Sequence, residues 1–122
     1  MTLELDDVPE HLRPAVAAAL ERAGVRDGHV SVQLVDEARI RELNRDHRGI
    51  DRATDVLSFP VDGAQGTPGP RELGDVVICP AESADVGEAA VHGTLHLCGY
   101  DHETDDGEML ALQDSVMASL ER

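Results

Sequence analysis

Residues 91–104 read V-H-G-T-L-H-L-C-G-Y-D-H-E-T, and this stretch decides how the chain is organised. His92 and His96 are four residues apart, so on an α-helix their side chains lie on one face. Gly99 permits a positive φ, which ends a helix and turns the chain. We therefore expect a helix that ends at Gly99, and a turn that returns His102 to the two helical histidines.

Three imidazoles arranged in this way predict a metal site, with His92, His96 and His102 as ligands. Three histidines leave a fourth tetrahedral position open for water, as in catalytic zinc sites. A closed structural site would need a fourth protein ligand, and Cys98 is the nearby candidate. Cys98 lies about 200° around the helix from His96, so we expect it to face away and pack as a small apolar residue.

The same histidine spacing occurs in zinc peptidases with the pattern H-E-x-x-H-x-x-G-x-x-H. Their glutamate is the general base, and the residue in its place here is Gly93. This glycine argues against ordinary peptidase chemistry, and we expect it to leave room beside the metal.

The rest of the chain predicts an α+β fold, in which a small mixed sheet of about four strands packs with helices. Alternating or β-branched runs indicate the strands, and 3.6-residue periodicity with caps indicates the helices. The expected strands are 1–6, 29–35, 54–61 and 73–79, the expected helices are 9–23, 36–45, 82–98 and 105–120, and a loop is expected at 62–70. We expect one domain over residues 1–122.

The composition limits the possible partners. The chain has 25 acidic and 10 basic residues, a net charge of −15, and an aromatic fraction of 2%. Such acidity argues against a general polyanion binder and against an anionic membrane surface. The two cysteines make no disulfide framework, and we see neither a signal peptide nor a spanning segment. We therefore expect a cytoplasmic protein.

Three blocks of the sequence resemble the YbeY endoribonuclease family. They are L-N-R-D-H-R-G-I-D-R-A-T-D-V-L-S-F-P at 43–60, L-G-D-V-V-I-C-P at 73–80, and the histidine block at 91–104. The resemblance implies one zinc ion, or another divalent metal, on His92, His96 and His102. It implies a single-strand-specific endoribonuclease that matures ribosomal RNA, notably the 3′ end of the small-subunit RNA, and serves ribosome quality control. The implied partners are single-stranded RNA and the ribosome, with no membrane and no DNA.

The segment between Pro80 and Val91 departs from the family because it is shorter and contains Gly87. Part of the metal-bearing helix is therefore expected to be missing or replaced by a loop.

The resemblance also places the family's functional arginine at Arg48. Arg48 precedes Gly49, outside the helix pattern, and its planar guanidinium suits a phosphate. The window 39–52 holds five arginines against three acidic residues. Arg39, Arg41 and Arg45 there form either a basic stripe for RNA or a solvated helix face with ion pairs.

Each of several other polar residues near these motifs has two possible roles. Asp55, Asp101 and Glu103 could orient a ligand histidine or act as caps and turn residues. His47 could transfer a proton or simply neighbour Arg48, and Tyr100 could stack a base or pack over the helix.

Two other functions stay open on the sequence alone. One is a zinc hydrolase that acts on peptides, and the other is a non-catalytic ribosome-associated module that the metal stabilises. The sequence does not set the oligomeric state.

Overall fold

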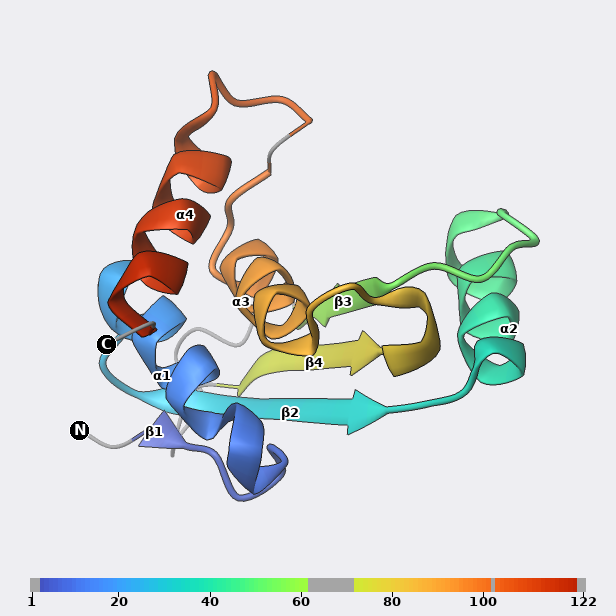
Figure 1. Cartoon of the computed structure of the whole chain (residues 1–122), viewed down its shortest axis with the longest axis horizontal. Helices are drawn as coiled ribbons and strands as arrows, with labels where there is room; N and C mark the ends of the chain where they lie inside the picture. The colour runs from blue at the N-terminus through green and yellow to red at the C-terminus, as the bar shows by residue number, and fades with distance from the viewer. Residues whose placement is uncertain (1–2, 62–71, 102, 121–122) are drawn as a thin grey trace.

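A computed structural model describes residues 3–61, 72–101 and 103–120 of the chain. Over these residues the fold is α+β, as expected, with a four-stranded mixed sheet and four α-helices (Figure 1). The strand order is β1-β2-β4-β3. The strands are β1 (Leu3–Glu4), β2 (Gly28–Leu34), β3 (Val56–Pro60) and β4 (Glu72–Ile78), and the helices are α1 (Arg13–Arg22), α2 (Glu37–Arg48), α3 (Val86–Leu97) and α4 (Glu108–Leu120).

The two central strands are parallel to each other and carry most of the sheet. β2 pairs parallel with β1 and β4, and β3 pairs antiparallel with β4. β3 therefore lies at one edge of the sheet. Pro60 ends this strand, which suits an edge position because proline has no N–H to donate to a neighbour.

The helices cover both faces of the sheet. α1 and α3 pack on one face through a cluster that includes Val16, Leu20, Val76 and Ala90. α4 packs against α1 and α3 through a second cluster that includes Val91, Leu95, Met109 and Val116. α2 packs on the opposite face through a small cluster of Ile40, Leu57, Val77 and Cys79. Successive residues of a strand point to opposite faces, so β4 serves one cluster with Val76 and another with Val77.

An ionic cluster joins the start of the chain to β2 and β4. Nδ1 of His29 lies 2.8 Å from a carboxylate oxygen of Glu72, and its Nε2 lies 2.7 Å from Asp7 Oδ2. The hydrogen bond with Glu72, followed by that with Asp7, raises the pKa of His29 above its ordinary value. The backbone carbonyl of Asp7 also accepts a hydrogen bond from the N–H of Val32. The cluster thus holds three segments together at the end of the sheet remote from α2 (Figure 1).

The sequence placed the elements correctly but missed some of their ends. The expected helix 82–98 was wrong at its start, because Pro80–Glu82 forms a separate 3₁₀ turn and α3 begins at Val86. The side chain of Asp85 caps α3 by accepting from the N–H of Glu88. Residues 80–85 thus form a 3₁₀ turn and a short connection instead of the first part of a helix. The expected loop 62–70 lies outside the described residues.

The helix expected over 36–45 also ends later, at Arg48. Asp36 caps its start by accepting from the N–H of Arg39, as its residue type predicts. Gly49 follows with a φ of 72° and ends the helix. The expectation that Arg48 lies outside the helix was therefore wrong, because Arg48 is the last residue of α2.

No helix within residues 3–61, 72–101 and 103–120 is both long enough and apolar enough to span a bilayer.

Candidate active-site groove

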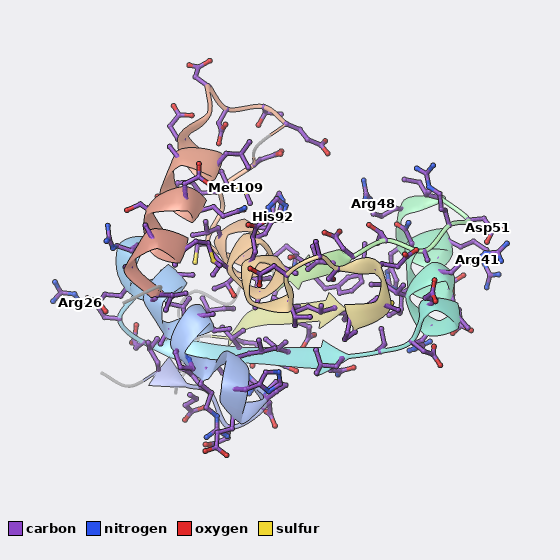
Figure 2. All side chains as sticks on the ribbon, viewed as in Figure 1. Arg26, Arg41, Arg48, Asp51, His92 and Met109 are labelled. Atoms are coloured by element: carbon purple, nitrogen blue, oxygen red, sulfur yellow. The ribbon has the colours of Figure 1, made fainter. Side chains whose placement is uncertain are left out.

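A cavity of about 850 Å³ runs along the edge of β3. We call this cavity the groove. α3 forms one side of it, the end of α2 forms the other, and β3 forms the floor. Its lining consists of His47, Arg48, residues 54–60, His92, His96, residues 99–101 and Glu103. Figure 2 shows His92 rising from α3 and Arg48 from the end of α2, both toward the same side of the molecule.

His92 and His96 lie together on the groove side of α3. Their ring centroids are 4.9 Å apart and the ring planes meet at 74°. Two imidazoles that bind one zinc ion at 2.0–2.1 Å with a tetrahedral angle place their ring centroids about 5 Å apart. The observed separation therefore fits two ligands of one metal ion.

The third predicted ligand, His102, lies outside the described residues. Within the described part of the chain, no group of three histidine, cysteine or acidic side chains is placed to hold a metal ion. His92, His96 and His102 therefore stay a predicted ligand set, of which the structure brings two members together.

Cys98 lies at the C-terminal end of α3 and packs against the cluster formed by α1, α3 and the sheet. It does not line the groove. Its placement matches the expectation of a packed apolar residue and gives no support to a closed site with cysteine as the fourth ligand.

Gly93 lies where α3 packs closely against the sheet. A Cβ atom added there would lie 2.6 Å from Val76 Cγ1 and 3.1 Å from both Ser58 Oγ and Val56 Cγ2. The expectation that this glycine leaves room beside the metal was wrong, because Gly93 faces the sheet. A glutamate in this position would point into the packed strands and could not serve as a base in the groove.

Ser58 links the floor of the groove to α3. Its hydroxyl donates a hydrogen bond of 2.9 Å to the carbonyl of Gly93. The close helix–strand contact that Gly93 allows is therefore also secured by a polar bond.

The backbone of β3 presents polar groups to the groove. Cys79 N–H donates to the carbonyl of Asp55, and Val61 N–H donates to that of Leu73. Antiparallel pairs alternate in their hydrogen bonding. Leu57 and Phe59 therefore direct their backbone groups toward β4, whereas Val56 and Ser58 direct theirs outward, along the groove.

The arginines of α2 differ in their partners. Arg39 pairs with Glu42, Arg41 with Asp51 and Arg45 with Asp46, all at the surface. These contacts support the ion-paired helix face rather than the basic stripe. The hydrogen bond from Arg41 lowers the pKa of Asp51. Arg48 is exposed and, within the described residues, makes no ion pair or side-chain hydrogen bond.

One buried and one partly buried residue fix the position of the α2 end and its following loop. The side-chain amide of Asn44 donates a hydrogen bond of 2.9 Å to the carbonyl of Arg52. Asn44 is 2% exposed although it is polar. Phe59 packs on the α2 cluster and its ring meets that of His47 edge-on at 4.8 Å. His47 and Arg48 are therefore presented from a braced helix end.

Two acidic residues of the groove accept hydrogen bonds from nearby backbone N–H groups, as turn residues do. Asp101 Oδ1 accepts from the N–H of Glu103, and Asp55 Oδ1 accepts from that of Val56. Both side chains still line the groove, as do Glu103 and Tyr100. Tyr100 also packs against the cluster of α3 and α4. Its position is therefore compatible with both predicted roles, stacking on a base and packing over the helix.

Sequence reasoning missed Gln113. Nothing in the pattern of the expected helix 105–120 singled this residue out. In the structure Gln113 is 8% exposed, and its Oε1 lies 2.8 Å from Nδ1 of His92. The available signal was a glutamine beside apolar positions of an otherwise amphipathic helix.

The similar proteins fall into one class of enzyme. A relative in Desulfitobacterium hafniense is 38% identical, with 96% of this chain and 93% of the relative aligned. A relative in Bradyrhizobium diazoefficiens is 43% identical over 89% of this chain and 70% of the relative. Both are named as endoribonucleases. The chain is therefore an endoribonuclease, a hydrolase that cuts RNA internally.

A family model described as "Endoribonuclease YbeY" matches residues 2–121. The chain belongs to the YbeY family, which confirms the resemblance seen in its three sequence blocks. The solution structure of TM1509 from Thermotoga maritima is similar, with a TM-score of 0.55 and 33% identity, over 93% of this chain and 83% of that one.

The comparison also bears on the length of the chain. The alignment with the Desulfitobacterium protein spans 146 positions, more than the 122 residues of this chain. The relative therefore has residues within the aligned region that this chain lacks. This agrees with a shortened segment somewhere inside the fold.

Proposed function

We propose that the chain is a zinc-dependent endoribonuclease specific for single-stranded RNA. We propose that it matures ribosomal RNA in the cytoplasm, including the 3′ end of the small-subunit RNA, and serves ribosome quality control. Residues 1–122 would act as one domain, with the ribosome as partner. The groove carries this proposal, because it sets a pair of imidazoles opposite an exposed arginine along one strand edge.

The proposed metal ligands are His92, His96 and His102. The separation of the first two rings, 4.9 Å, suits a shared ion. A zinc ion held there would make a water molecule acidic near neutral pH and withdraw charge from a phosphoryl oxygen. Zinc suits imidazole ligands, although three histidines accept other divalent metals as well.

Arg48 is proposed as the catalytic residue that binds the phosphate. Its guanidinium stays charged at all relevant pH values and can contact two phosphate oxygens at once. It can therefore orient the scissile phosphate toward the imidazole side and stabilise the negative charge that builds on the oxygens during cleavage.

The RNA strand is proposed to lie along β3. The outward N–H of Ser58 can donate to the substrate, and the outward carbonyls of Val56 and Ser58 can accept from it. A duplex is too wide to reach a strand edge between two helices, whereas a single strand is narrow and has unpaired base edges. The net charge of −15 then disfavours long, nonspecific contacts with RNA.

The test compares tag-free wild type with His96→Ala on labelled single-stranded RNA, with and without chelator, after bound metal has been measured. We expect about one metal ion per wild-type chain. We expect cleavage that both the chelator and the substitution abolish. Leu110→Ala, at an exposed position of α4, serves as the matched control and should bind metal and cleave normally.

Two outcomes would contradict the proposal. Bound metal with intact RNA would indicate a structural site or another substrate, and a peptide panel would then follow. Cleavage that survives metal removal would exclude the proposed role of the histidines.

A further inference from the structure

His92 has a partner on α4 that the proposed mechanism does not use. Its Nδ1 atom lies 2.8 Å from Oε1 of Gln113, which is 21 residues further along the chain. His92 lines the groove, and Gln113 does not. The contact therefore reaches His92 from α4, from a residue outside the groove lining.

Gln113 lies between residues of α4 that are packed in the protein interior. It lies four residues after Met109 and three before Val116, so the three side chains share one face of α4. Met109 and Val116 are both fully buried, in a cluster with Val91 and Leu95 of α3. This packing fixes the distance between α4 and the helix that carries His92.

A glutamine in this apolar setting needs a partner. Burying an amide without a hydrogen bond costs about 1–3 kcal/mol in proteins. Gln113 is 8% exposed, and the imidazole of His92 provides its Oε1 with a donor. The hydrogen bond explains why an apolar residue does not fill this position.

The contact also decides which ring nitrogen of His92 carries the proton. A neutral imidazole has one N–H, and an amide oxygen can only accept. The proton therefore lies on Nδ1, and Nε2 keeps the lone pair that a metal requires.

We propose that Gln113 is a positioning residue that holds His92 in the Nδ1–H tautomer, with Nε2 available for the metal. This inference rests on the metal site of the proposed function. Loss of a residue that hydrogen-bonds to a metal ligand lowers metal affinity by about 10–100-fold. α4 must therefore be packed against α3 for Gln113 to orient His92 toward the metal.

The first test measures zinc affinity by competition with a chromophoric chelator at pH 8. Gln113→Met keeps the size of the side chain and removes the acceptor, so zinc affinity should fall about 10–100-fold. Gln113→Glu restores an acceptor oxygen and should keep the wild-type affinity or exceed it. Gln33→Met on the exposed end of β2 is the matched control and should bind zinc as wild type does.

The second test reads the tautomer of His92 directly, first in wild type and then in Gln113→Met. Nitrogen-15 NMR of the histidine rings, with His92→Ala to assign the signal, should show the Nδ1–H tautomer of His92 in metal-free wild type at pH 8. In Gln113→Met the Nε2–H tautomer should gain population.

Equal zinc affinity in wild type and Gln113→Met would overturn the inference, as would the Nε2–H tautomer in wild type. If Gln113→Met does not fold, the wild-type tautomer decides alone. Wild type that binds no zinc would instead overturn the proposed function, so the two failures are distinguishable.

Discussion

The hydroxyl of Ser58 donates to the carbonyl of Gly93, where α3 packs closely against the sheet. This bond joins the floor of the groove to the helix that carries the paired histidines. The position of those histidines over β3 therefore depends on Gly93, where a larger residue would not fit.

We predict that Gly93→Ala destabilises the fold. The new methyl group would overlap Val76, and overpacking of this kind costs about 1–3 kcal/mol. The better helix propensity of alanine returns up to about 1 kcal/mol. The measurement is the denaturant midpoint, with Gly87→Ala as the control, since a Cβ there meets only the Asp85 side chain. Equal midpoints for the two variants would contradict the packing argument.

We predict that Arg48→Ala lowers RNA cleavage by about 10²–10³-fold, the range seen when one stabilising donor is removed from a transition state. Arg48→Lys should recover part of the activity, because it keeps the charge but loses the planar fork. The measurement is the single-turnover cleavage rate. Arg39→Ala, which removes a surface ion pair outside the groove, is the control. Full activity in Arg48→Ala would remove this residue from the mechanism.

We predict that Ser58→Pro weakens RNA cleavage more than Ser58→Ala. Proline removes the outward N–H without breaking the ladder to β4, and Pro60 occupies an equivalent position in the same strand. A hydrogen bond to a charged group contributes about 1.5–3 kcal/mol, which corresponds to roughly 10–100-fold in kcat/KM. Ser58→Ala loses only the bond to Gly93 and therefore serves as the control.

If the two Ser58 variants cleave RNA equally while both remain folded by circular dichroism, the substrate does not contact this edge of the sheet.

We predict that the His29 cluster stabilises the protein at low rather than high pH. The pKa of His29 is raised by Glu72 and Asp7. Its contribution is therefore fully present below the unfolded pKa, about 6.5, and is lost as the pH rises through the folded pKa. The expected size is at most about 1 kcal/mol, because the carboxylates are partly exposed.

The measurement is the free energy of unfolding of His29→Gln relative to wild type, at pH 5.5 and pH 9. The difference between the two proteins should be larger at pH 5.5. His11→Gln, an exposed histidine in the first 3₁₀ turn, controls for general charge effects. A difference that grows with pH would contradict the prediction.

The sequence was sufficient for the element order, since periodicity and caps report local structure. Asp36 shows this, because its side chain alone identifies the start of α2. The end of α2 was harder to place, since the charged residues near Arg48 give no apolar period to follow. The start of α3 was misjudged because Glu82 suits a helix locally, while Pro80 and the Asp85 cap divide the segment.

The candidate site was predictable where it depends on spacing along one helix. His92 and His96 illustrate this, since four residues separate them. Contacts between elements could not be predicted in this way. Neither the packing of Gly93 against Val76 nor the pairing of Gln113 with His92 leaves a local pattern, because the partners come from distant segments.

The two sides of the groove rest on different hydrophobic clusters. Arg48 lies on α2, which packs through the small cluster around Ile40, while His92 lies on α3, which packs through a cluster shared with α1 and α4. Small clusters open at lower free energy than the whole fold. On warming, the enzyme should therefore lose its cutting activity before its main core melts, and regain it on cooling.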